Sequence, residues 1–197
     1  QTVRVKLAAA GDIYYTTDGS APTEESTPYT GAITVDKTTV LRAAAVEEGG
    51  APSRALTLSF FIGEEHTLPV LSLVTDSPQR FSETYNGAVK YRECAANLSL
   101  LAPEGGFSID CGVELKGRTS LFNPKKSLGV SFRGCYGAET LRYDIFGKGP
   151  AEFTELSIRA GQDYISTVFR NELMQELCAE LDTTVTQRSR YCVLYIN

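Results

Sequence analysis

The chain has 197 residues, of which 42% are hydrophobic and 22% are charged, with 17 glycines and 8 prolines. This composition excludes a disordered or collagen-like chain and fits one large or two small globular domains. The net charge of −5, from 19 basic and 24 acidic residues, argues against a nucleic-acid partner. No apolar run approaches the ~18 residues that a membrane-spanning helix requires, so we expect no membrane span.

Both ends of the chain indicate a piece of a longer protein. It starts at Gln1, its single methionine is Met174, and it ends at Asn197 directly after an apolar, strand-like run. We therefore expect a trimmed or processed fragment, and any signal peptide would lie outside it.

The cysteines and the single histidine do not suggest a metal centre. The chain holds His66 and five cysteines without a C-x-x-C pair: Cys94, Cys111, Cys135, Cys178 and Cys192. A Cys/His zinc site therefore has no usable spacing. Two interpretations of the cysteines stay open, mostly buried free thiols or one disulfide.

Residues 1–62 follow a strand pattern without helical periodicity. Asp18-Gly19-Ser20 predicts an Asx-type turn, in which the Asp18 carboxylate is an acceptor and Gly19 adopts a positive φ. Short apolar, β-branched and aromatic runs separated by turns predict a small β-sandwich, with strands at Val3–Leu7, Ile13–Thr17, Ile33–Val35, Val40–Val46 and Leu56–Phe61.

Residues 63–197 combine strands with one clear helix, which predicts an α+β second domain in a chain that is mainly β. A short turn or helix is expected from Asp76. Apolar residues at helical spacing predict the main helix over about Tyr164–Leu181, capped by Asp163, with Phe169 and Leu173 on a buried face. Strands are expected at Leu68–Thr75, Ala95–Leu101, Phe107–Lys116, Ser127–Arg133, Phe153–Arg159 and Tyr191–Asn197. The turn Pro103-Glu104-Gly105-Gly106 predicts that the second and third of these strands form a hairpin.

Opposite charges gather on neighbouring predicted elements of this second domain. The stretch from Lys116 to Lys148 has seven basic and two acidic residues, a net +5. The stretch from Asp163 to Asp182 has one basic and five acidic residues, a net −4. Ion pairs between strand and helix and two separately solvated faces both fit this distribution.

Lys126 is the basic residue for which pairing matters most. It has the same strand parity as Leu128 and Val130, so we expect its side chain to lean toward the apolar side. A lysine buried there needs a partner, and Glu172 and Glu176 share one stripe of the predicted helix. A strand lysine paired with a helix glutamate is also how kinases position a cation against nucleotide phosphates.

The turn chemistry of the N-terminal segment supports a family resemblance. Tyr15–Thr23, Tyr29-Thr30-Gly31 and Leu41-Arg42-Ala43 resemble motifs of the chitobiase/β-hexosaminidase C-terminal module, over residues 3–62. The resemblance implies a fibronectin-III-like accessory module of bacterial surface and carbohydrate-active proteins, and not a catalytic domain.

A second set of motifs lies in residues 66–197. Gly112–Ser120, Pro124–Leu128 and the closing Tyr195-Ile196-Asn197 resemble the CotH kinase family of spore-coat-type atypical kinases. The resemblance implies a kinase-like N-lobe, an antiparallel sheet plus one main helix, without the second lobe that carries base and metal ligands. The chain departs from the family at Leu121, where arginine is common, and at Asn171, where aspartate is frequent.

The CotH resemblance also implies a nucleotide site. Lys126 or Lys125 would contact the phosphates, and Arg118 and Ser120 would line the phosphate side. Glu172 or Glu176 would pair with the lysine. The parent protein would transfer phosphate from ATP, with Mg²⁺, to a protein hydroxyl, whereas this fragment alone would be inactive and is assigned no catalytic or metal-binding residue.

The sequence thus predicts a secreted or cell-surface bacterial protein with two domains. Residues 1–62 would form the accessory β-sandwich, and residues 63–197 the truncated kinase-like domain. The expected partner is a protein substrate or a surface component, with a glycan as a further candidate. The alternative function is a non-catalytic cell-surface or carbohydrate-associated adhesion module.

Overall fold

The structure is a computed structural model that describes residues 2–147, 149–161, 169–182 and 184–197. The chain divides into two compact units. The first contains the chain up to Phe81 together with Cys94–Ile109 and Val193–Asn197. The second contains Ser82–Glu93 and Asp110–Cys192. The predicted domain boundary after residue 62 lies inside the first unit and stays a prediction.

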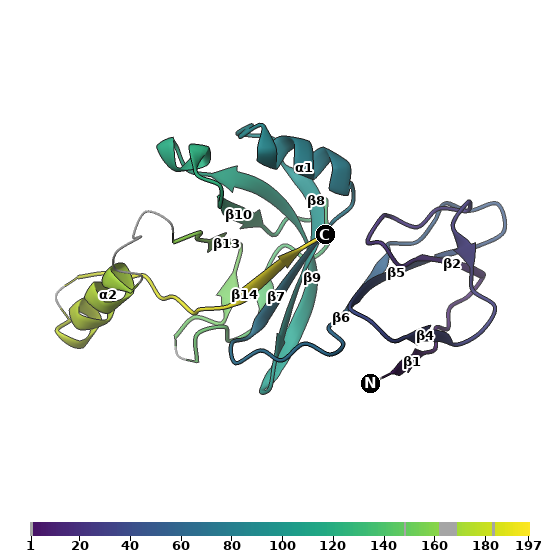
Figure 1. Cartoon of the computed structure of the whole chain (residues 1–197), viewed down its shortest axis with the longest axis horizontal. Coiled ribbons are helices and arrows are strands. Elements are labelled where there is room, and N and C mark those ends of the chain that lie inside the picture. Colours follow the sequence, from purple (N-terminus) through teal and green to yellow (C-terminus); the bar gives the residue numbers. More distant parts are fainter. Residues whose placement is uncertain (1, 148, 162–168, 183) are drawn as a thin grey trace. The chain divides into compact units, whose positions relative to one another are not determined.

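Two small antiparallel sheets form the N-terminal part of the first unit (Figure 1). One pairs β1 (Val3–Val5) with β4 (Ile33–Val35). The second sheet has the strand order β3 (Thr27–Pro28), β2 (Asp12–Thr16), β5 (Thr39–Val46) and β6 (Leu56–Phe60). The chain is mainly β, as predicted, and these two sheets are consistent with the predicted β-sandwich.

The predicted Asx-type turn after β2 is confirmed. The Asp18 Oδ1 atom accepts hydrogen bonds from the Ser20 backbone N–H at 3.0 Å and from the Ser20 hydroxyl at 2.6 Å. Gly19 has a φ of 82°, a conformation that is unfavourable for residues with a Cβ. The two bonds from Ser20 lower the pKa of the Asp18 carboxyl. This carboxylate therefore has a structural role in the turn.

Strand β7 (Val70–Thr75) is the central strand of the rest of the first unit. It pairs antiparallel with β8 (Cys94–Ala102) and parallel with β14 (Val193–Ile196), which lies alongside it in Figure 1. All six residues of β7 are buried, which explains its almost continuous apolar sequence. The sequence predicts the three strands, but not the parallel pairing of β7 with β14.

Strands β8 and β9 (Gly105–Lys116) form the predicted hairpin, with Pro103 and Glu104 between them. Gly105 has a φ of 128°. A Cβ on Gly106 would lie 1.9 Å from the Leu100 carbonyl oxygen, so only glycine fits at this position. The two consecutive glycines are therefore required by the turn itself.

In the second unit, β9 pairs antiparallel with β10 (Ser127–Ser131), and β10 pairs with β13 (Glu155–Ile158). The predicted alternation of β10 is confirmed, because its apolar residues are buried: Leu128, Val130 and the following Phe132. The predicted strand 153–159 is divided in two, and its first part, β12 (Glu152–Phe153), pairs with β11 (Leu141–Arg142). The interruption is at Thr154, whose carbonyl accepts a bond from the Phe132 N–H.

The structure describes two α-helices, α1 (Pro78–Asn86) and α2 (Arg170–Glu180). Helix α1 agrees with the expected short turn or helix that follows Asp76. The predicted main helix agrees with α2 at its C-terminal end, whereas Asp163 and residues 164–168 lie outside the described residues. Among the described residues, no helix is long and apolar enough to cross a membrane.

The buried face predicted for this helix is wrong for the part that the structure describes. No residue of α2 is buried, and Leu173 and Leu177 are 47% and 46% exposed. Phe169, just before the helix, is 60% exposed. Periodic spacing creates an apolar stripe, but it does not supply an element that packs against that stripe.

All five cysteines are free thiols, which decides between the two interpretations left open by the sequence. Only part of the expected burial is found, however. Cys94 and Cys111 are buried, Cys178 and Cys192 are partly buried, and Cys135 is exposed. Burial raises the pKa of the Cys192 thiol, against the opposing effect of the Arg190 and Lys125 charges.

Candidate functional site

The candidate phosphate-binding residues lie in the connection between β9 and β10. We call residues 117–126 the cationic turn, because they include three basic residues and no acidic one. The turn contains the 3₁₀ helix η1 (Thr119–Phe122). Gly117 has a φ of 130°, and a Cβ there would lie 2.3 Å from the Ser120 Oγ atom. Glycine thus allows the Ser120 hydroxyl to lie directly against the backbone at the start of the turn.

Lys126 is the most constrained cation of the turn. Its backbone N–H donates to the Tyr85 hydroxyl at 2.8 Å. Its ammonium donates to the Asn123 carbonyl at 3.0 Å and lies 5.0 Å from the centroid of the Tyr85 ring. Lys126 is half-buried, so its side chain leans inward as expected. It packs against the Tyr85 ring of α1, however, and not against a glutamate.

The other predicted phosphate contacts are more open to solvent. Arg118 and Lys125 are exposed, and Ser120 is half-buried. The turn therefore brings Arg118, Ser120, Lys125 and Lys126 into one short connection, as their closeness in the sequence already suggests. Two of the three cations stay accessible to an anion from solution.

The two glutamates that the sequence suggests as partners of Lys126 are Glu172 and Glu176. Lys126 forms no salt bridge with Glu172 or Glu176 in the part of the chain that the structure describes, because its ammonium is bound to Asn123 and Tyr85. Glu172 is half-buried, and its Oε2 atom is buried without a hydrogen-bond partner. Together with the larger effect of burial, Glu172 raises the pKa of Tyr191. Glu176 is exposed.

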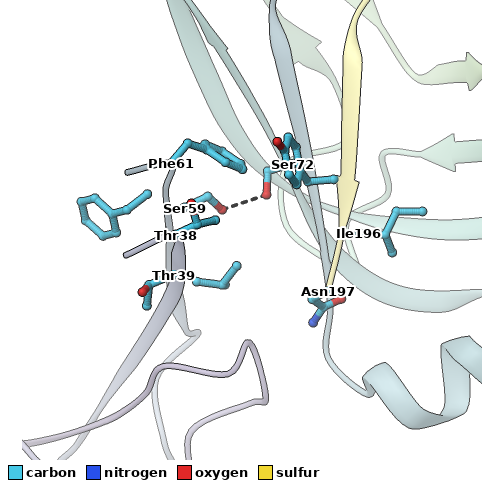
Figure 2. Close-up of a pocket in the computed structure, with 10 residues that line it drawn as sticks. Thr38, Thr39, Ser59, Phe61, Ser72, Ile196 and Asn197 are labelled. Atoms are coloured by element: carbon cyan, nitrogen blue, oxygen red, sulfur yellow. Dashed lines mark hydrogen bonds between the residues drawn. The ribbon is translucent and has the colours of Figure 1, made fainter. Parts of the chain in front are cut away.

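Sequence reasoning missed a small pocket in the first unit. Its volume is about 170 Å³. Thr38, Ser59 and Phe61 line one side and Ser72 and Asn197 the other, and the Ser59 and Ser72 hydroxyl oxygens are 2.8 Å apart (Figure 2). These residues come from distant parts of the sequence, so no local pattern indicates the pocket.

A polar cluster borders this pocket at Tyr195. The Tyr195 hydroxyl donates to the Glu64 carboxylate and lies 3.0 Å from the His66 Nε2 atom. The other Glu64 oxygen accepts a bond from the Thr38 hydroxyl. The Thr38 bond, followed by the Tyr195 bond, lowers the pKa of Glu64, and the Glu64 bond raises the pKa of Tyr195. His66, the only histidine, thus belongs to a satisfied hydrogen-bond cluster and not to a cysteine–histidine pair.

Comparison with known protein families gives a match in the N-terminal part of the chain. Residues 1–57 match the family model described as chitobiase/beta-hexosaminidase C-terminal domain. No curated protein and no solved structure matches the chain. The match covers the strands from β1 into β6 and supports the fibronectin-III-like module that the sequence predicts there.

Proposed function

We propose that the cationic turn binds the phosphate groups of a nucleotide, as part of a secreted or surface-associated atypical protein kinase. The observation that carries the proposal is the concentration of Arg118, Lys125 and Lys126 in one turn without an acidic residue, in a chain whose net charge is −5. A local cation cluster on an acidic protein favours an anionic ligand. The CotH-like motifs occupy the same residues and supply the expected reaction class.

The chemistry of each side chain fits a phosphate. The Arg118 guanidinium can donate two parallel hydrogen bonds to phosphate oxygens, and the Ser120 hydroxyl can donate one. The Lys126 ammonium has three donors, of which the Asn123 carbonyl occupies one. Its contact with the Tyr85 ring fixes the direction of the side chain before a ligand binds. Lys125 is the exposed alternative to Lys126.

The ATP-bound Mg²⁺ has a weaker basis in this chain. In the described part of the chain, no group of three or more His, Cys, Asp or Glu side chains could hold a metal ion. The residues of the cationic turn can therefore account for contacts to the phosphate groups only. When bound, ATP would supply the phosphoryl group for a protein hydroxyl.

Calorimetric titration with Mg-ATP tests the proposal. We expect saturable binding that Lys126→Ala weakens by about tenfold or more, because a charge-assisted hydrogen bond is lost. Lys37→Ala, which removes an exposed lysine of the N-terminal module, is the matched control and should bind like the unaltered chain.

Three outcomes are informative. Loss of binding in Lys125→Ala but not in Lys126→Ala would assign the phosphate contact to Lys125. Equal weakening by Lys37→Ala would indicate a diffuse charge effect and would contradict a site in the turn. Absence of binding at millimolar Mg-ATP would overturn the proposed function.

The family match favours a second candidate function, a carbohydrate-associated binding module. It covers residues 1–57, where Tyr14 and Tyr15 of β2 are half-buried and keep part of their rings accessible for stacking on sugars. Cosedimentation with insoluble chitin tests this candidate. We expect Tyr14→Ala or Tyr15→Ala to reduce the bound fraction, and a chain that stays in the supernatant would exclude chitin as the ligand.

A further inference from the structure

Two segments of the second unit expose aromatic rings beside cations. Tyr91 is 85% exposed and Phe122 is 86% exposed. Val89, which is 41% exposed, lies close to Tyr91 in the sequence. The Lys90 ammonium lies 5.1 Å from the centroid of the Tyr91 ring. We call residues 89–92 together with Phe122 the aromatic surface.

One contact joins the elements from which the two segments extend. Tyr85 lies near the end of α1, just before residues 89–92, and Lys126 lies shortly after Phe122. The hydrogen bond from the Lys126 N–H to the Tyr85 hydroxyl and the cation–π contact join these residues. The loop that follows α1 and the turn that contains η1 therefore extend from a shared anchor.

The loop that carries Tyr91 has a defined and costly backbone. Ala88 and Tyr91 have φ values of 52° and 58°, in the left-handed region that non-glycine residues rarely adopt. Hydrogen bonds from the Ala88 and Val89 N–H groups to the Tyr85 and Thr84 carbonyls hold the start of the loop. The loop thus keeps a strained conformation in which an apolar ring is almost fully in water, a combination common at recognition sites.

The charges around the two rings are mainly positive. Lys90 and Arg92 flank Tyr91, and Arg118 and Lys125 lie on either side of Phe122 in the sequence. Glu93 is neutralised by Arg133, whose Nη1 atom is 2.7 Å from its carboxylate. Because the whole chain has a net charge of −5, this local excess of cations is not a property of the surface in general.

We propose that the aromatic surface docks onto an anionic lipid bilayer. At 85% and 86% exposure, the Tyr91 and Phe122 rings are almost fully open to solvent and project from the surface. A fluid interface can close around projecting rings, and aromatic side chains favour the headgroup level of a bilayer. Lys90 and Arg92 would meet the anionic headgroups, where each cation strengthens binding by about fivefold.

This peripheral binding goes beyond the proposed nucleotide site and does not depend on it. Arg118 and Lys125 add to the local positive charge, but the residues that the test changes are Tyr91, Phe122, Lys90 and Arg92, none of which is assigned to phosphate contact. Vesicle binding can therefore fail while Mg-ATP still binds, and Mg-ATP binding can fail while the chain still binds vesicles.

Cosedimentation with vesicles tests the proposal, using pure phosphatidylcholine and an equimolar mixture with phosphatidylglycerol. We expect binding to the anionic vesicles only. Tyr91→Ser combined with Phe122→Ser should weaken it by about tenfold or more, because both apolar anchors are lost. Val185→Ser, which removes an apolar side chain that is 98% exposed outside this surface, should have no effect.

A charge pair of variants completes the test. Lys90→Gln with Arg92→Gln should weaken binding by more than tenfold, whereas Arg4→Gln with Lys37→Gln changes the net charge equally and should have little effect. Equal binding to neutral vesicles, or equal loss in both charge pairs, would overturn the proposal. A third result would also overturn it: soluble polyphosphate displaces the chain from the vesicles, and the Tyr91→Ser and Phe122→Ser double variant still binds them. The ligand would then be a free polyanion.

Discussion

The two helices differ in a way that separates the formation of a helix from its burial. Helix α1 is the shorter of the two, yet Phe81 is 3% exposed and Thr84 is 1% exposed. Helix α2 has regularly spaced leucines, yet Leu173 and Leu177 are nearly half exposed. Local spacing therefore predicts which backbone forms a helix, whereas contacts from distant residues decide whether it becomes part of a core.

Helix α1 is held by such contacts near both ends. Asp76, just before the helix, accepts a bond from Arg42 Nη2 at 2.6 Å, and Arg42 is only 4% exposed. Near the other end, the Tyr85 hydroxyl accepts the Lys126 N–H at 2.8 Å. If this comparison is correct, substitutions on α1 and at its anchors should cost far more than substitutions on the leucine stripe of α2.

The largest effect is expected for Phe81→Ala. Removal of a fully buried phenyl ring loses its transfer free energy and leaves a cavity, so the free energy of unfolding should fall by about 3–5 kcal/mol. Urea denaturation followed by circular dichroism measures this change. Phe122→Ala, at a ring that is 86% exposed, is the matched control and should change stability by less than about 0.5 kcal/mol. Similar losses in the two variants would contradict the burial of α1.

Asp76→Ala should have the next largest effect. It leaves the buried Arg42 guanidinium without its carboxylate, which in a fully buried pair costs about 3–5 kcal/mol. The Asp76 side chain is 47% exposed, and water compensates part of the loss, so we expect about 1–3 kcal/mol. Thermal and urea unfolding should both show it. Asp36→Ala at an exposed position is the control, and equal stability of the two variants would show that the ion pair does not hold the start of α1.

Tyr85→Phe removes the hydroxyl that accepts the Lys126 N–H, and the loss of this bond should cost about 1 kcal/mol. The phenyl ring stays in place, so the cation–π contact should persist. Tyr14→Phe, which removes a tyrosine hydroxyl from β2, is the matched control. Hydrogen exchange of the Lys126 amide gives a direct measurement, and unchanged protection in Tyr85→Phe would contradict this anchor at the end of α1.

The sequence predicts local features of this fold well. The Asp18-Gly19-Ser20 turn and the Gly105-Gly106 hairpin depend on backbone conformations that only a few residue types allow. The burial of Leu128 and Val130 follows from strand alternation. In each case the physical cause lies within a few neighbouring residues, so a pattern in the sequence is sufficient.

Features that depend on distant residues were not predictable in the same way. The parallel pairing of β14 with β7 and the cluster of Glu64, His66 and Tyr195 need the folded chain to bring them together. At the candidate site, the sequence suggests that Lys126 continues the strand pattern of Leu128 and Val130 and pairs with a glutamate, whereas Lys126 lies just before β10. The ring of Tyr85 takes that place, and no spacing rule links a short helix to a strand so far along the chain.

The smallest effect is expected for Leu177→Ala, and it is the sharpest test of the comparison. Leu177 is 46% exposed, and alanine has at least the helix propensity of leucine, so stability should change by less than about 0.5 kcal/mol. Leu128→Ala, at a fully buried leucine of β10, should cost about 2–5 kcal/mol in the same urea assay. If Leu177→Ala costs more than about 2 kcal/mol, the leucine stripe is covered in solution, and regular spacing would then have predicted burial on α2 after all.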